Sequence, residues 1–174
     1  MDHKDLPTLL RATARLRERS CPARIVIAGD GPLRAEVEGL IDKLALRDCV
    51  RTLGQRDDIP DLIAAADVVV LPSVREGLSN VILEGMMGGR PVVASRAGGN
   101  IELVEHERSG LLFDVGDDAA LADAFVRLAQ DPSLRERLGE GARARAHSHF
   151  SIPSMVKAYE KTYGDVVRER VALH

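Results

Sequence analysis

The sequence predicts an α/β protein with a doubly wound, Rossmann-like parallel sheet. Short apolar runs rich in β-branched residues alternate along the chain with amphipathic stretches of helical period. The apolar runs are continuous, which is typical of parallel strands buried on both faces, and the stretches between them are long enough for helical crossovers. We therefore expect about five parallel strands with helices packed on the sheet.

The predicted elements follow one another in a regular order. Apolar residues with a helical period, placed after a possible cap at Asp5, predict a first helix over residues 6–16. A β-branched run at 24–28 leads through a turn at 29–32 into an amphipathic helix at 33–46. The alternation continues with predicted strands at 50–53, 68–71, 91–94 and 110–113 and predicted helices at 59–65, 79–87, 100–104 and 119–129.

The pattern is entirely helical from Pro132 onward. A charged segment runs to Ala146, and residues 151–153 then open a last helix that carries apolar residues on one side, namely Val156, Tyr159 and Tyr163. We expect this helical tail, at about 151–174, to pack across the end of the domain. No low-complexity linker or longer internal repeat interrupts the chain, so residues 1–174 are interpreted as one domain.

The composition favours one compact domain and excludes several classes of function. The chain has 174 residues, 45% of them hydrophobic, which is enough to bury a core. Lys and Arg number 24 against 27 Asp and Glu, and no long block of one sign indicates a nucleic-acid-binding arm. Aromatic residues are only 3%, so no stacking platform for single-stranded nucleic acid is expected. The longest apolar run, at 68–71, is far shorter than the roughly 20 residues of a membrane span.

The cysteines and the amino terminus predict a cytoplasmic location. Cys21 and Cys49 lie far apart and fit no metal-ligand spacing, so we interpret them as buried or half-buried thiols in a reducing compartment. The first five residues contain no apolar segment of the kind found in a signal peptide. The histidines are scattered and have no cysteines near them, so no metal site is expected.

The loop after the predicted strand at 68–71 is the richest candidate site. Ligands of an open parallel sheet bind at the carboxyl ends of its strands. This loop enters a helix through Gly77, Leu78 and Ser79, and glycine there allows close backbone approach. Because a helix amino terminus offers unpaired amides and a partial positive charge, the loop predicts a phosphate or pyrophosphate site that needs no metal.

Two carboxylates accompany this predicted phosphate site. Glu76 lies in the loop and Glu84 about one turn inside the following helix, so both can face one cleft. A carboxylate beside a diphosphate is tolerated when it accepts hydrogen bonds from sugar hydroxyls, and such charge-assisted bonds are strong. A ligand that carries both phosphates and hydroxyls is a nucleotide sugar.

Residues 76–95, with the sequence EGLSNVILEGMMGGRPVVAS, resemble the signature of the group 1 glycosyltransferases, family 4. The similarity extends to the turns at 29–32, 54–58 and 98–99 and to residues 110–113, and so covers nearly the whole chain. Enzymes of this family are retaining and have the GT-B fold. The resemblance implies that this chain is the C-terminal, donor-binding half, with its first strand and an N-terminal acceptor domain outside the sequence. The chain alone is expected to be inactive.

The resemblance also implies roles for individual residues. Glu76 is expected to hold the hydroxyls of the transferred sugar as the catalytic residue, and Glu84 the hydroxyls of the ribose. The backbone amides after Glu76, from Gly77, Leu78, Ser79 and Asn80, are expected to hold the sugar and the diphosphate. Lys4 matches the family's lysine at the start of the first helix, which steadies the diphosphate, whereas the family's companion arginine has no counterpart in this sequence.

The other donor-site candidates each have two interpretations. Arg56 either flanks the nucleobase, as its loop does in the resembling enzymes, or is a solvated loop charge. Gly98 and Gly99 either admit a phosphate closely or permit a sharp turn between strand and helix. Gly29 begins a G-x-G sequence, but Arg34 stands where a dinucleotide fingerprint requires its third glycine, which favours a structural turn near the ligand.

The favoured function is therefore that of half of a retaining glycosyltransferase that uses a nucleoside diphosphate sugar and no other cofactor. Stabilisation of the leaving diphosphate is expected to dominate catalysis, since no carboxylate nucleophile is evident. A noncatalytic nucleotide-sugar-binding module, for example in polysaccharide assembly, is one alternative. Another GT-B enzyme, a sugar-nucleotide epimerase or a phosphorylase, is a second. Contact with nucleic acid is not expected, and any membrane contact is expected through the missing half. An exposed apolar surface that promotes self-association is also expected.

Overall fold

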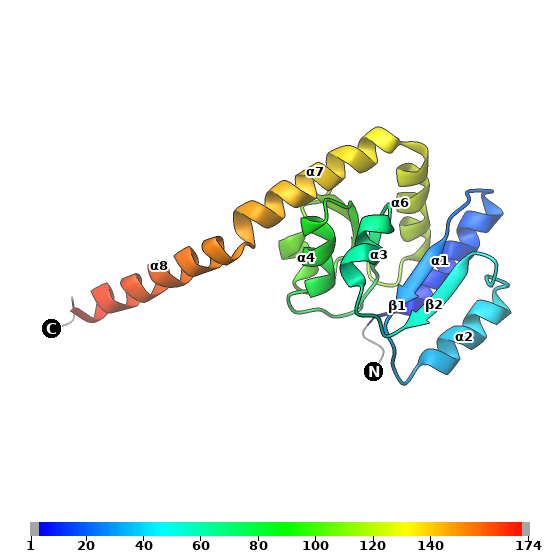
Figure 1. The fold of residues 1–174 in the computed structure, drawn as a ribbon, viewed down its shortest axis with the longest axis horizontal. Coiled ribbons are helices and arrows are strands. Elements are labelled where there is room, and N and C mark those ends of the chain that lie inside the picture. Colours follow the sequence, from blue (N-terminus) through cyan, green and yellow to red (C-terminus); the bar gives the residue numbers. More distant parts are fainter. Residues whose placement is uncertain (1–3, 172–174) are drawn as a thin grey trace.

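The computed structural model describes residues 4–171, in which strands and helices alternate as the sequence predicts (Figure 1). No described helix is long and apolar enough to cross a membrane. The elements are α1 (Leu6–Glu18), β1 (Ile25–Ala28), α2 (Arg34–Lys43), β2 (Val50–Gly54), α3 (Ile59–Ala65), β3 (Val69–Leu71), α4 (Asn80–Met87), β4 (Val92–Ser95), α5 (Asn100–Leu103), β5 (Gly110–Phe113), α6 (Asp118–Gln130), α7 (Pro132–His149) and α8 (Ile152–Val171).

The five strands are parallel, as predicted, but they form two sheets. Strand β1 pairs with β2, and the second sheet has the order β3-β4-β5. No ladder joins β1 to β3 within residues 4–171. The parallel strands and their alternation with helices are those of the predicted fold class, but the described strands do not form one continuous ladder.

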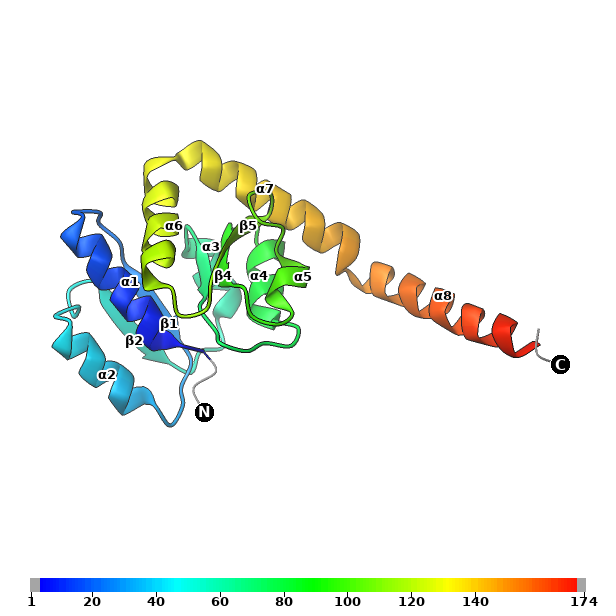
Figure 2. The same cartoon turned by 180° about the vertical axis from the view of Figure 1, so that it is seen from behind.

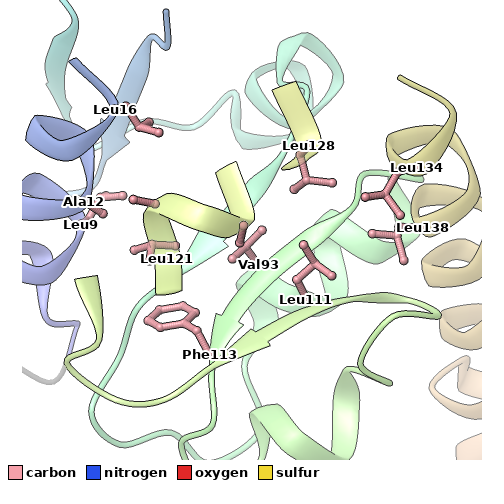
Figure 3. Close-up of a cluster of buried hydrophobic side chains, with 12 residues drawn as sticks. Leu9, Ala12, Leu16, Val93, Leu111, Phe113, Leu121, Leu128, Leu134 and Leu138 are labelled. Atoms are coloured by element: carbon pink, nitrogen blue, oxygen red, sulfur yellow. The ribbon is translucent and has the colours of Figure 1, made fainter. Parts of the chain in front are cut away.

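The two sheets nevertheless share a core. A buried cluster joins α1, α6 and the first half of α7 to strands β4 and β5 (Figure 3). Ile27 of β1 and Val70 of β3 both pack against this cluster, so the two sheets lie beside each other beneath α1 and α6. A second cluster lies on the other face, between the β3-β4-β5 sheet and helices α4, α5 and α7, and a third joins α1, α2 and β2.

Burial on both faces holds for only part of the sheet. Every residue of β4 and β5 is buried, as their continuous apolar runs predict. Strand β1 alternates between half-buried and exposed residues, and Val26 is 53% exposed. Leu53 in β2 is 37% exposed. One face of the β1–β2 sheet is thus only partly covered by the described residues, although the continuous apolar run of β1 predicts burial on both faces.

The tail does not pack across the end of the domain. Helix α8 continues outward from the end of α7 and projects from the body (Figures 1 and 2). It carries an exposed apolar stripe whose members are between 45% and 74% exposed, namely Ile152, Met155, Val156, Tyr159, Tyr163, Val166 and Val167. The predicted one-sided pattern is present, but the described residues offer no surface that buries it. The expected tail also included residues 172–174, which lie outside the described residues.

Candidate functional site

The candidate site is built by two neighbouring loops at the carboxyl end of the β3-β4-β5 sheet. Because β3 and β4 are parallel and Leu71 is paired with Ala94, the loop at 72–79 and the loop at 96–99 leave the sheet side by side. The Ser95 hydroxyl donates to the Ser73 carbonyl, and the Gly99 amide donates to the Glu76 carbonyl over 3.2 Å. These bonds tie the two loops together.

The glycines at 98 and 99 allow this contact. A Cβ atom added to Gly98 would lie 1.9 Å from the Glu76 carbonyl oxygen, and one added to Gly99 would lie 1.9 Å from the Gly77 carbonyl oxygen. Gly98 also has a φ of 47°, in the region that favours glycine. The sequence left open whether these glycines serve a turn or a ligand. In the structure, the group that approaches them closely is the backbone of the Glu76 loop.

The Glu76 carboxylate is the best-connected side chain of the site. Its Oε1 atom accepts hydrogen bonds from the Lys4 Nζ atom and from the Ser73 hydroxyl, each over 2.7 Å. The Glu76 side chain is 13% exposed, and Ser73 is fully buried. The structure therefore brings together two predicted site residues, Lys4 and Glu76, that are 72 positions apart. Sequence reasoning missed Ser73, for which the only signal was its place between strand β3 and Glu76.

The start of helix α4 presents backbone amides. Ser79 is the N-cap, and its buried side chain accepts from the Ile82 amide over 3.4 Å, so this hydroxyl is already used. Within residues 4–171, the amides of Gly77, Leu78 and Ser79 have no hydrogen-bond acceptor. Gly77 has open space where a Cβ would stand, so an anion could reach these amides.

Glu84 lies on the exposed side of α4. The opposite side of this helix packs Ile82 and Met86 into the core. Among the described residues, the Glu84 carboxylate has no hydrogen-bond or ion-pair partner. An unpaired carboxylate one turn from the open amides can accept hydrogen bonds from a ligand's hydroxyls.

Arg56 is engaged within its own loop after β2. Its guanidinium forms two hydrogen bonds with Asp58, of 2.7 and 2.5 Å. This pairing raises the pKa of Arg56 and lowers the pKa of Asp58, in each case chiefly through the hydrogen bonds. Arg56 is exposed and makes no contact with Glu76, so the structure does not join it to the main cluster.

Gly29 serves the turn after β1. Its φ is 127°, a backbone conformation that other residues rarely adopt, and no atom lies near the position of a Cβ. The Gly29 amide donates to the Gly54 carbonyl over 2.7 Å, and Asp30 accepts from the Gly31 amide and from Arg34. Backbone geometry alone therefore accounts for glycine here. Within residues 4–171, neither Gly29 nor Arg56 forms a hydrogen bond with Glu76.

Two surface hollows lie away from this site. One is lined by residues around Cys21 and Cys49 and the other by residues around Arg90 and Arg143, at the ends of the strands opposite the candidate site. Neither is lined by a predicted donor residue. In residues 4–171, no three His, Cys, Asp or Glu side chains are grouped in a way that could hold a metal ion. The candidate site consists of the backbone amides after Glu76, one lysine and two carboxylates.

Comparison with known proteins identifies the family of the chain. A family model described as "Glycosyl transferases group 1" matches residues 1–131. The chain belongs to the group 1 glycosyl transferases. It is 40% identical over 144 residues to the lipopolysaccharide core biosynthesis glycosyltransferase LpsD of Rhizobium meliloti, which covers 83% of this chain and 42% of LpsD. It is 35% identical over 147 residues to N-acetyl-alpha-D-glucosaminyl L-malate synthase of Bacillus anthracis, covering 84% of this chain and 39% of that enzyme.

Similar solved structures confirm the fold class. HepE of Anabaena, crystallised with UDP, superposes with a TM-score of 0.86 at 31% identity over 95% of this chain and 46% of HepE. Sucrose-phosphate synthase from Thermosynechococcus elongatus superposes with a TM-score of 0.80 at 32% identity over 99% of this chain and 43% of that enzyme. The chain therefore spans about two fifths of the length of the curated relatives it matches. HepE was also crystallised with UDP-glucose.

Proposed function

We propose that this chain binds a nucleoside diphosphate sugar as the donor half of a retaining glycosyltransferase. The observation that carries the proposal is the cluster in which Lys4 and Ser73 converge on Glu76 beside the open amides of helix α4. The crystal structures of HepE with UDP and with UDP-glucose support it, because HepE superposes on nearly the whole chain.

The charges of the site are arranged as such a ligand requires. The open amides after Glu76 and the amino terminus of α4 favour a diphosphate, and Lys4 adds a full positive charge beside them. Glu76 and Glu84 can accept hydrogen bonds only, which suits sugar and ribose hydroxyls. We assign the transferred sugar to Glu76 and the ribose to Glu84. Arg56 can contact the nucleobase only when its hydrogen bonds with Asp58 are broken.

The reaction needs stabilisation of the leaving group more than a nucleophile from this chain. The bond between the anomeric carbon and the diphosphate breaks as the acceptor oxygen attacks on the same face of the sugar. The acceptor's proton passes to an oxygen of the departing diphosphate. Lys4 and the amides of Gly77 and Leu78 stabilise the negative charge that develops there. The acceptor is held by polypeptide outside this chain, which alone does not complete the transfer.

The proposed site takes its positive charge from the protein, so binding of the donor requires no metal ion. Both cysteines are free thiols, which supports a reducing compartment such as the cytoplasm as the location.

The test is calorimetric titration of this chain with UDP, GDP and ADP and with the glucose conjugate of each, in buffer containing EDTA. One nucleotide should bind, and Glu84→Ala should weaken it about tenfold, because a charged hydrogen-bond acceptor is lost. Glu160→Ala on α8 is the matched control, since it removes an exposed helical glutamate far along the projecting helix, and it should leave the affinity unchanged. Absence of binding to all six ligands would refute the proposal for this chain.

A further inference from the structure

The hydroxyl of Ser73 is placed to fix the direction of the Glu76 carboxylate. It donates to Glu76 Oε1 over 2.7 Å, from a residue that is completely buried. A buried hydroxyl has few alternative partners, so its bond to a carboxylate holds one oxygen in a defined place. The second donor to this oxygen, the Lys4 ammonium, belongs to a side chain that is 53% exposed.

Ser73 is itself held by a second layer of buried polar groups. The Ser95 hydroxyl donates to the Ser73 carbonyl, and the Asn100 side-chain amide donates to the Ser95 carbonyl over 3.1 Å. Ser95 and Asn100 are both fully buried. A chain of hydrogen bonds thus runs from helix α5 through strand β4 and the start of the β3–α4 loop to the carboxylate.

The two donors to Glu76 behave differently when a diphosphate arrives. Lys4 is attracted to the new negative charge and can turn toward it, whereas Ser73 is neutral and enclosed. When Lys4 turns away, the Ser73 hydroxyl still donates to Glu76 Oε1. This bond keeps the carboxylate in a constant direction toward the sugar.

We propose that Ser73 is a positioning residue for Glu76, which aims the carboxylate at the sugar of the bound donor after Lys4 has moved to the diphosphate. The inference rests on the proposed function, in which Glu76 holds the transferred sugar. Ser73 acts through Glu76 and touches no ligand, so its effect is confined to ligands that carry a sugar.

The experiment compares two affinities for each variant, that for the preferred nucleoside diphosphate and that for its glucose conjugate. Ser73→Ala should weaken binding of the glucose conjugate about tenfold and change binding of the free nucleotide by less than about twofold. Ser73→Thr, which retains the hydroxyl, should restore the affinity for the conjugate. The melting temperature of each variant is measured alongside.

Ser109→Ala is the matched control for loss of a buried serine hydroxyl. Ser109 is as buried as Ser73, but it bonds to the Glu105 backbone before strand β5, at the opposite end of the sheet. A general loss of stability would lower the affinity for both ligands in Ser73→Ala and in Ser109→Ala. A selective loss of the conjugate in Ser73→Ala alone supports the inference.

A double-mutant cycle with Glu76→Ala tests whether Ser73 acts through Glu76. If Ser73 acts through Glu76, adding Ser73→Ala to Glu76→Ala should cost less than about twofold more, because the group that it positions is gone. If the two substitutions lower the affinity for the conjugate additively, or if Ser73→Ala leaves that affinity unchanged, the role of Ser73 is overturned. Neither result would contradict the proposed donor site. Failure of the unmodified chain to bind any of the six ligands would overturn both.

Discussion

The Lys4 ammonium lies 2.7 Å from Oε1 of Glu76, so the start of the first helix is joined to the loop that follows strand β3. This ion pair connects segments that belong to different sheets: Lys4 precedes α1, which leads into β1, whereas Glu76 follows β3. It places a cation that is 53% exposed on the loop whose open amides lead into α4. In the proposed function, the Lys4 ammonium leaves the Glu76 carboxylate and pairs with the diphosphate of the bound donor.

Replacement of Lys4 tests that exchange. Lys4→Met should weaken nucleotide binding about tenfold, because one charged contact to the diphosphate is lost, and raising the salt concentration should reduce the difference. The free energy of unfolding should change by less than about 1 kcal/mol, since the Lys4 end of the pair is 53% exposed and screened by solvent. Lys4→Arg is the control that keeps the charge. Equal affinities of Lys4→Met and the unmodified chain at low salt would contradict the assignment.

Gly99 should tolerate no side chain. Gly99→Ala places a Cβ 1.9 Å from the Gly77 carbonyl, so the Glu76 loop must shift. We expect a loss of about 1–3 kcal/mol in stability, together with weaker binding of the nucleotide sugar. Gly31→Ala is the matched control, because open space surrounds that Cβ position and the φ of Gly31 is not positive. Denaturant titration and calorimetry measure the two effects, and equal behaviour of the two variants would show that the loops are not packed as described.

Helix α8 should contribute little to the stability of the body. Tyr163→Ser removes a side chain that is 67% exposed and should change the free energy of unfolding by less than about 0.5 kcal/mol. Leu138→Ala, in the buried part of α7 (Figure 3), should cost about 2–5 kcal/mol. Both are measured by denaturant unfolding. A large loss in Tyr163→Ser would mean that the α8 stripe is buried in solution, for instance by self-association, which a concentration series would reveal.

The Glu107–Arg127 pair should make stability depend on pH in the acid range. Arg127 donates two hydrogen bonds to Glu107, of 2.7 and 3.0 Å, and these chiefly lower the pKa of the carboxyl below its ordinary 4.5. A lowered folded-state pKa stabilises the protein above the unfolded-state pKa, and this stability disappears as the pH falls through the folded-state value.

Glu107→Gln should therefore be less stable than the unmodified chain at pH 7. The difference should be no more than about 0.5 kcal/mol, because the Glu107 side chain is 43% exposed and solvent screens the pair. It should shrink as the pH falls from 4.5 through the lowered folded-state pKa of Glu107, below which both proteins carry an uncharged side chain. Melting temperatures from pH 3 to pH 7 provide the measurement, with Glu160→Gln as control. A difference that does not depend on pH would rule out this pair as its origin.

Local patterns in the sequence predicted most of the secondary structure. Strand β5 has the predicted bounds, 110–113, and the other strands and helices fall within a few residues of theirs. Helix and strand periods, caps and glycine turns are properties of neighbouring residues, so they can be interpreted without the fold. The same local signals indicated the loop after β3 as the site, and the family resemblance then supplied roles for Glu76, Glu84 and Lys4.

Only the tertiary structure decided which distant groups meet. The bond from Ser73 to Glu76, the close approach of Gly98 and Gly99 to the Glu76 loop, and the Lys4–Glu76 pair depend on how β3, β4 and α1 are placed relative to one another. The division of the sheet and the outward course of α8 also departed from expectation. An apolar pattern predicts which face of an element is buried. It does not predict whether the covering surface belongs to the same chain, because burial depends on contacts that are remote in sequence.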